Sequence, residues 1–167
     1  MSTFNDLEFA EVEIPSVLAA QIPAESASDP ASISSAMGEA FETLMIFLKR
    51  HALVPCGPPR AIYRSYNTEG TKFVVAMPIV TPFGSVAGGS GFVDSISGGK
   101  ALRFTHHGSY QDLMKTYEQI TQFLLAKGLM KSEADWTQFM PMWEEYLNDP
   151  ATTPEAELLT YIYLPIA

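Results

Sequence analysis

The second half of the chain repeats the pattern of the first half, and each copy ends in the same kind of apolar strand. The first copy finishes with Phe73-Val-Val-Ala-Met-Pro-Ile79, and the second finishes with Thr160-Tyr-Ile-Tyr-Leu-Pro-Ile166. A matched strand precedes each of these, around residues 60–63 and 143–146. Two copies of one small unit must bury their apolar faces against each other, and the junction between them is a natural place for a pocket. The repeat therefore favours a binding function without naming the ligand.

Hydrophobic periodicity predicts the elements of the first copy. Alternation over residues 8–14 and 17–23 indicates two strands joined by a turn at Pro15-Ser16, which is a hairpin pattern. Asp29-Pro30 is typical of a helix start. The helix that follows has an apolar stripe at spacings of three and four: Ile33, Met37, Phe41, Leu44 and Leu48. Strands at about 60–67 and 71–80 complete this copy.

The second copy follows in the same order, with strands at 92–96 and 101–106, a helix over about 110–126, and strands around 143–146 and 160–166. The inward stripe of its helix comprises Tyr110, Leu113, Tyr117, Ile120 and Phe123 or Leu124. We predict a single α+β domain over residues 1–167, with both helices on one face of an antiparallel sheet. Its predicted parts are repeat one at about 7–80, a glycine-rich connection at about 82–91, and repeat two at about 92–166.

The charge pattern argues against nucleic acid as a partner. The net charge is −9, and the ten Lys and Arg residues are scattered singly along the chain. Binding a phosphate backbone needs a basic surface that releases counterions, so we expect no direct nucleic-acid binding. An acidic surface favours cationic ligands or basic partners through long-range steering, although it also serves simply for solubility.

The sequence also predicts the compartment. The N-terminal region carries acidic residues in place of a positive segment followed by an apolar stretch, so we expect no signal peptide. No uncharged apolar run approaches the ~20 residues that span a bilayer, so we expect no membrane association and a cytoplasmic location. Cys56 is the only cysteine, which excludes an internal disulfide, and we interpret it as a loop residue without a chemical role.

Metal and cofactor chemistry finds little support in the sequence. The three histidines, His51, His106 and His107, have no partners at the spacing of a zinc site. We interpret His51 as a cation at a helix C-terminus, and His106 and His107 as residues that shape a strand-to-helix turn. The chain lacks a G-x-S-x-G elbow and a phosphate-binding loop. We therefore expect no metal and no cofactor, and we assign no catalytic residue.

Aromatic and methionine residues are concentrated in the last third of the chain. Tyr and Trp in a cleft suit planar or cationic ligands, because stacking and cation–π attraction contribute ~0.5–2 kcal/mol. Core packing is the alternative explanation. It is weaker for Tyr161 and Tyr163, which share one face of a strand and need partners for their hydroxyl groups when buried. The concentration comprises Trp136, Phe139, Met140, Met142, Trp143, Tyr146, Tyr161 and Tyr163.

Four segments together resemble the GyrI-like small-molecule-binding domain, which has a SOUL-like fold and is also the effector-binding domain of BmrR-type and AraC-type regulators. The resemblance covers nearly the whole chain, and the mutual spacing of its motifs is fairly specific. The segments are Pro55-Cys-Gly-Pro-Pro-Arg-Ala-Ile-Tyr63, His106-His-Gly-Ser-Tyr110, Trp143-Glu-Glu-Tyr-Leu-Asn-Asp-Pro150 and Glu157-Leu-Leu-Thr-Tyr-Ile-Tyr-Leu-Pro-Ile166.

The resemblance implies a duplicated βαββ unit with a central cleft between the repeats that accepts lipophilic, often cationic, molecules. Since no helix-turn-helix segment precedes the first strand, we expect a stand-alone copy that senses or sequesters its ligand. Tyr161 stands where family members commonly carry a glutamate that pairs with cationic ligands, and Glu145 is the predicted substitute. The residues expected to line the cleft are Tyr63, Trp143, Glu145, Tyr146, Tyr161 and Tyr163.

Two further functions follow from the same resemblance. One is hydrolysis of strained-ring cytotoxic compounds, which needs an acid beside a polarising hydroxyl group. Glu145 with Tyr161 is the pair nominated for that role, although the sequence favours a binding protein over an enzyme. The other is inhibition of a protein partner, in the manner of the DNA gyrase inhibitors of this family. Haem binding, as in SOUL proteins, has no axial-ligand candidate beyond the three histidines.

Overall fold

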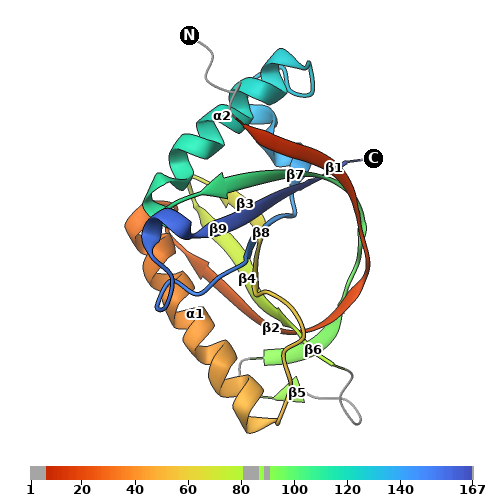
Figure 1. Cartoon of the computed structure of the whole chain (residues 1–167), viewed down its shortest axis with the longest axis vertical. Coiled ribbons are helices and arrows are strands. Elements are labelled where there is room, and N and C mark those ends of the chain that lie inside the picture. The colour runs from red at the N-terminus through yellow and green to blue at the C-terminus, as the bar shows by residue number, and fades with distance from the viewer. Residues whose placement is uncertain (1–6, 81–86, 89–90, 167) are drawn as a thin grey trace.

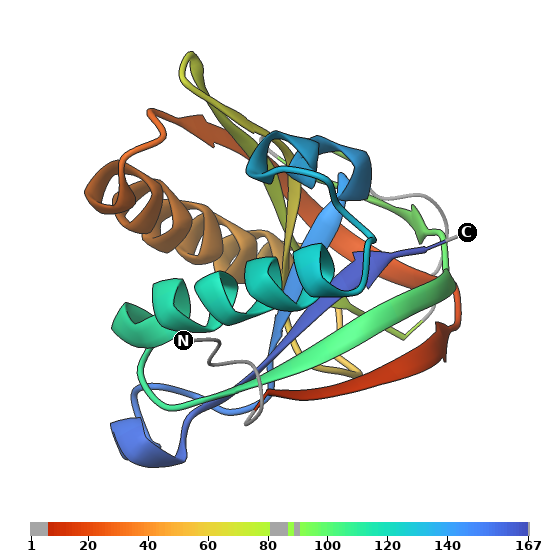
Figure 2. The ribbon, with the colours of Figure 1, turned by 90° about the horizontal axis from the view of Figure 1, so that it is seen from above.

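A curved antiparallel sheet, covered on one face by two helices, forms the whole of the structure (Figures 1 and 2). The computed structural model describes residues 7–80, 87–88 and 91–166. The helices are α1 (Pro30–Arg50) and α2 (Leu113–Ala126). The strands are β1 (Glu8–Ile14), β2 (Val17–Ser26), β3 (Arg60–Asn67), β4 (Gly70–Pro78), β5 (Ala87–Gly88), β6 (Gly91–Ile96), β7 (Gly99–His107), β8 (Met142–Tyr146) and β9 (Leu159–Pro165).

Local sequence signals set the ends of α1. The Asp29 carboxylate accepts a hydrogen bond from the Ser32 amide at 2.9 Å, and Pro30 occupies the first helical position. The Ser32 hydroxyl also donates to this carboxylate, at 2.7 Å, and the hydroxyl and amide bonds together lower the pKa of Asp29, because they stabilise the charged form. Lys49 and Arg50 lie in the last turn, where cations are favourable, and His51 caps the helix as predicted.

The order of the strands is β1-β7-β9-β8-β3-β4-β2-β6-β5. Apart from β5, this order is two-fold symmetric about the β3–β8 contact, because β1, β2, β3 and β4 occupy the positions that β6, β7, β8 and β9 occupy on the other side. The α+β class with two main helices is thereby confirmed, whereas the exact repeat boundaries stay a prediction. Most of the predicted connection at 82–91 lies outside the described residues.

The predicted hairpin of β1 and β2 is wrong. β1 pairs with β7, and β2 pairs with β4 and β6. The first strand of each repeat, β1 or β6, therefore adds to the half of the sheet that the other repeat forms. A two-residue hairpin turn needs positive φ, which proline cannot adopt, and Pro15-Ser16 instead lets the chain run on in an arc (Figure 1). The β6–β7 link runs beside this arc so closely that a Cβ at Gly98 would lie 1.9 Å from the carbonyl oxygen of Ile14.

The two faces of the sheet carry different cores. On the helix face, α2 packs on Phe104, Ile162 and neighbouring residues, α1 packs on Phe73, Val75 and their neighbours, and Tyr63 contacts both clusters. On the open face, a smaller cluster forms around Ala19, Ile62, Val74 and Ala76, with Ile96 and Trp143 against it. The sheet curls around this open face, away from the helices (Figure 1).

The second helical segment starts differently from the prediction. Residues Tyr110–Asp112 form a short 3-10 turn, and the α-helix begins at Leu113. Of the predicted stripe, Ile120, Phe123 and Leu124 are buried, and Leu113 and Tyr117 are partly buried against the same core. Gly128, with φ of 72°, follows the end of the helix in the left-handed conformation that ends helices.

Candidate functional site: a buried carboxylate among tyrosines

A single glutamate lies at the centre of the molecule, where the two halves of the sheet meet. Glu144 is on β8, which pairs with β3, and only 4% of its surface is exposed. Alternate residues of a strand face the same side, so Glu144 shares its face with Met142, which belongs to the core under α2. The carboxylate therefore points toward the helices from the middle of the sheet.

Two tyrosine hydroxyl groups hold this carboxylate. Tyr117 of α2 donates a short hydrogen bond to Oε2 of Glu144. Tyr146, two residues further along β8, donates to Oε1 at 2.6 Å. Each carboxylate oxygen therefore has one phenol donor, one from a helix and one from the sheet. We name Glu144, Tyr63, Tyr117 and Tyr146 the Glu144 cluster.

Burial controls the protonation of the Glu144 cluster. It raises the pKa of the Glu144 carboxyl, while the hydrogen bonds from Tyr117 and Tyr146 act in the opposite direction. Burial and the nearby Glu144 charge raise the pKa of all three tyrosines well above the usual value. The phenols therefore keep their protons and stay hydrogen-bond donors.

No Lys or Arg side chain within the described ranges forms an ion pair with Glu144. The ion pairs found there are Arg60 with Glu145, His107 with Glu8, and Lys115 with Asp112. A buried carboxylate is costly without a counter-charge, and phenol hydrogen bonds repay only part of that cost. Among the described residues Glu144 thus lacks a Lys or Arg counter-charge, and the nearby His106 and the two phenols favour its charged form.

Aromatic rings cover the outer side of the cluster. Phe41 of α1 packs edge-on against Tyr146 with ring centroids 6.0 Å apart, and Tyr110 does so from the other side at 5.5 Å. Phe41 and Tyr110 are both only half-buried. These rings lie between α1 and the start of α2, so any molecule reaching Glu144 from this side meets aromatic faces first.

Polar contacts fix the helix that supplies Tyr117. One ring nitrogen of His106 lies 2.8 Å from the Ser109 carbonyl oxygen and the other lies 2.6 Å from the Thr116 hydroxyl, so this buried side chain ties β7 to the start of α2. The predicted role of His106 at the strand-to-helix turn is confirmed. Trp136 packs edge-on against the Tyr117 ring, with centroids 6.0 Å apart.

The six side chains that the sequence assigned to one cleft lie on two faces. Tyr63 and Tyr146 belong to the Glu144 cluster on the helix face. The other four project from the open face, where Trp143 stacks on Tyr163 with ring centroids 4.9 Å apart, and Tyr161 lies beside Tyr163. The shared face of Tyr161 and Tyr163 is confirmed. The four open-face residues are Trp143, Glu145, Tyr161 and Tyr163.

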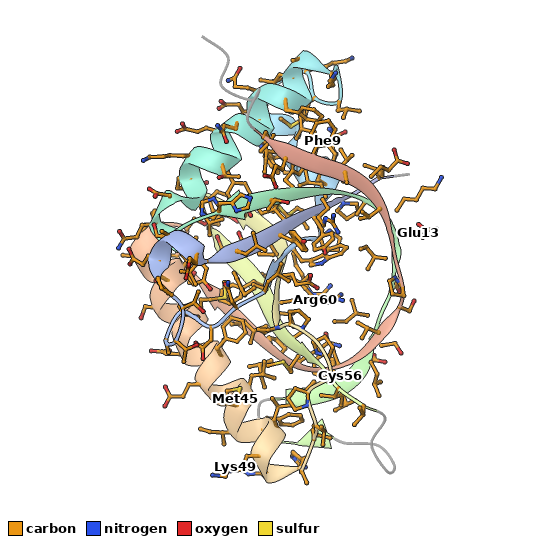
Figure 3. All side chains as sticks on the ribbon, in the orientation of Figure 1. Phe9, Glu13, Met45, Lys49, Cys56 and Arg60 are labelled. Atoms are coloured by element: carbon orange, nitrogen blue, oxygen red, sulfur yellow. The ribbon has the colours of Figure 1, made fainter. Side chains whose placement is uncertain are left out.

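Glu145, the predicted acid of the cleft, already has partners on the open face. Its Oε2 lies 3.7 Å from Nε of Arg60, and its Oε1 accepts a hydrogen bond from Tyr163 at 3.1 Å. Figure 3 shows Arg60 on the side of the sheet away from α1 and α2. The ring of Tyr161, whose hydroxyl was nominated to act with Glu145, packs against the Arg103 guanidinium. The Cζ atom of Arg103 lies 4.5 Å from the centroid of this ring.

Sequence reasoning missed Glu144, although a signal was present. In Met142-Trp-Glu-Glu-Tyr146, the glutamate at 144 alternates with Met142 and Tyr146, which are typical core residues. An acid flanked at i−2 and i+2 by buried side chains is a buried acid that needs donors. The aromatic character of Trp143 drew the assignment to the other face.

The described residues show neither a metal-binding cluster nor a membrane-spanning helix. Within residues 7–80, 87–88 and 91–166, no three His, Cys, Asp or Glu side chains come together in a way that could hold a metal ion. None of the helices found in these ranges is both long and apolar enough to cross a membrane. Cys56 is exposed in the loop before β3.

Solved structures share this fold. The C-terminal domain of EcmrR superposes with a TM-score of 0.76 and 16% identity, covering 97% of this chain and 98% of that domain. In the EcmrR–DNA complex the TM-score is 0.75 with 18% identity, and the match covers 95% of this chain but only 57% of the EcmrR chain.

Two further structures match over most of their length. SAV2435 bound to tetraphenylphosphonium gives a TM-score of 0.64 at 11% identity, covering 96% of this chain and 94% of that one. A hydrolase from Listeria innocua gives 0.59 at 11% identity, covering 96% and 92%. At such low identity these likenesses show the fold, and no curated protein sequence gives a significant match.

The family assignment comes from the sequence itself. A profile of the GyrI-like small molecule binding domain matches residues 26–167, which is most of the chain. The matched region contains both helices, the β3–β8 junction and every member of the Glu144 cluster. The chain therefore belongs to the family of GyrI-like small-molecule-binding domains.

Proposed function

We propose that this domain binds lipophilic cations between α1 and the start of α2, with Glu144 as the counter-charge, and so senses or sequesters them. One observation carries the proposal: a 4%-exposed carboxylate has two phenol donors and no ion-pair partner among the described residues. A cation placed beside it would offset the cost of burying the charge. The alternative is that Glu144 has a purely structural role, which predicts no binding of cations at this site.

The surroundings suit a cation with an apolar body. The rings of Phe41, Tyr110 and Tyr146 offer flat faces on which such a cation gains ~0.5–2 kcal/mol of cation–π attraction. The net charge of −9 attracts cations over a longer range. The shared fold with SAV2435, whose structure holds tetraphenylphosphonium, supports the same ligand class. The match to the model of the GyrI-like small molecule binding domain supports a small-molecule-binding role.

Titration with tetraphenylphosphonium tests the proposal, using calorimetry and the fluorescence of Trp136 in a Trp143→Phe background. Trp136 lies against Tyr117, so we expect quenching from the helix face. Glu144→Gln should weaken binding at least about tenfold, because it removes a charge interaction of roughly 1.5–3 kcal/mol. Neutral triphenylphosphine oxide should bind more weakly than the cation and respond little to this substitution.

Glu145→Gln is the matched control, since it removes the neighbouring carboxylate from the opposite face. We expect it to leave the affinity for the cation nearly unchanged. A loss of binding in Glu145→Gln but not in Glu144→Gln would overturn the assignment of the site. Equal affinity of the cation and the neutral compound would overturn the role of charge.

Hydrolysis of strained rings is the second candidate, and the same geometry favours it. Glu144 can take a proton from a water molecule as the water oxygen bonds to a ring carbon, while Tyr117 or Tyr146 gives its proton to the ring heteroatom as the carbon–heteroatom bond breaks. The proton on Glu144 then returns to the phenolate. This carboxyl–phenol arrangement replaces the pair Glu145 and Tyr161 nominated from the sequence. Incubation with a styrene epoxide and detection of the diol tests it, and unchanged turnover in Glu144→Gln would exclude this mechanism.

A further inference from the structure

A cavity lies on the open face of the sheet, on the opposite side from the Glu144 cluster. Its volume is about 400 Å³, within the size range of small-molecule sites. Ile62, Ile96 and Trp143 form its apolar part, and all three belong to the open-face cluster. Trp143 and Glu144 are adjacent in sequence but face opposite sides of β8, so the sheet separates this cavity from the cation site.

The charge of this cavity is opposite to that of the protein. Arg64 and Lys100 are among its lining residues, and no Asp or Glu is, although the chain has 19 acidic and only 10 basic residues. Lys100 alternates with Leu102 of the helix-face core and lies opposite Glu13 of β1, so its side chain turns to the other face and Arg64 supplies the charge. Asp94, on the open face beside the cavity, accepts a hydrogen bond from the amide of Ser95 through its carboxylate. The cavity therefore has one guanidinium and no carboxylate in its lining.

Arg64 follows Ile62 by two residues on β3, so alternation turns both side chains toward the cavity. The register with β4 shifts between Tyr63 and Ser65, and Arg64 is the extra residue of this bulge, where the ladder is locally disrupted. Within the part of the chain that the structure describes, the exposed Arg64 side chain forms neither a hydrogen bond nor an ion pair, so its guanidinium is available to a ligand.

The rest of the open face adds to the positive character. Arg60 and Arg103 project from it, so it carries three of the four arginines of the chain. Glu145 offsets one of these charges through Arg60, and Asp94 is a second acid on this face. Ser97, Gly98 and Gly99 of the β6–β7 link also line the cavity.

From this cavity we infer a second ligand site that takes small organic anions with a flat apolar body, such as aromatic carboxylates. The flat body packs against Trp143 and the two isoleucines, and the carboxylate pairs with the fork-shaped guanidinium of Arg64. This site differs from the proposed cation site in its face, its charge and its tryptophan. The two proposals therefore stand or fall separately.

Titration with 2-naphthoate tests the inference, with the neutral 2-naphthamide as comparator. Fluorescence is followed in a Trp136→Phe background, which leaves Trp143 as the only tryptophan. We expect 2-naphthoate to quench Trp143 and to bind at least about tenfold tighter than the amide, because only the carboxylate forms a charge-assisted hydrogen bond with the guanidinium. Amide chemical shifts of residues 95–100 should move with it.

Arg64→Gln should weaken 2-naphthoate binding about tenfold, and Arg64→Lys should restore part of it. The matched control is Arg50→Gln, an exposed arginine at the end of α1, which should have no effect. Absence of 2-naphthoate binding, binding that ignores Arg64→Gln, or shifts confined to the Glu144 cluster would each overturn the inference. None of these results would count against the proposed binding of cations at Glu144, which the tetraphenylphosphonium titration tests.

Discussion

Glu144 and Glu145 are neighbours in sequence, yet they sit in opposite chemical settings. Glu144 faces the helices and is held by two neutral phenols. Glu145 faces the open side and lies between the Arg60 guanidinium and the Tyr163 hydroxyl. One carboxylate is thus buried without a cation, and the other is paired with one.

The contrast between Glu144 and Glu145 shows how β8 can place neighbouring residues on two different faces of the sheet. Because side chains alternate across β8, three consecutive residues present a stacking ring, an unpaired acid and a paired acid to two separate faces. An acid already paired with an arginine has little to gain from a cationic ligand. An acid held by phenols has no such partner among the described residues, so the helix face suits the proposed cation site better.

The largest expected effect on the free energy of unfolding comes from removing the phenol donor of each acid in turn. Tyr117→Phe should lower the free energy of unfolding by about 2–3 kcal/mol, because it takes a donor from a buried carboxylate that has no cation. Tyr163→Phe should cost about 1 kcal/mol, since Arg60 remains beside Glu145. Chemical denaturation of the two variants measures both values. Equal losses would mean that the two acids are equally well compensated.

Arg60→Met tests the paired side of the contrast. Both partners are mostly buried, with 10% and 13% of their side chains exposed, but the 3.7 Å separation is too long for a good hydrogen bond. We therefore expect a cost of about 2 kcal/mol, below the usual range for breaking a buried ion pair. Arg50→Met, at an exposed site, should change stability by less than about 0.5 kcal/mol. A negligible effect of Arg60→Met in denaturation would remove the contrast between the two acids.

The sequence predicted what local signals control. Asp29-Pro30 marks the start of α1, and the strand at 60–67 matches β3 (Arg60–Asn67), because caps and alternation depend on neighbouring residues. The β1–β2 hairpin failed because strand pairing is decided by the whole sheet. The site was only half predicted for the same reason: alternation separates Glu144 from Glu145, but only the fold shows which face the helices cover.

The smallest expected effect is in the pH dependence of the free energy of unfolding, and it comes from Glu144. Burial raises the folded-state pKa of Glu144 above its ordinary value of 4.5, so the folded protein holds this proton more tightly than the unfolded chain does. Stability from this group is therefore complete below pH 4.5 and is lost as the pH rises through the folded pKa.

Glu144→Gln cannot ionise, so it should lack this loss. Its stability relative to wild type should improve as the pH rises above 4.5 and level off beyond the folded pKa, with a slope of at most about 1.4 kcal/mol per pH unit. Any fixed cost of the amide in the cluster adds a constant and leaves this slope unchanged.

In Tyr117→Phe the loss of stability with rising pH should extend to higher pH than in wild type, because the hydrogen bond that opposes the rise in the pKa of Glu144 is gone. Denaturation of these variants across the acidic range measures the slopes. A pH-independent difference between wild type and Glu144→Gln would mean that Glu144 is as well solvated in the folded protein as in the unfolded chain, and its claim to bind a cation would fail with it.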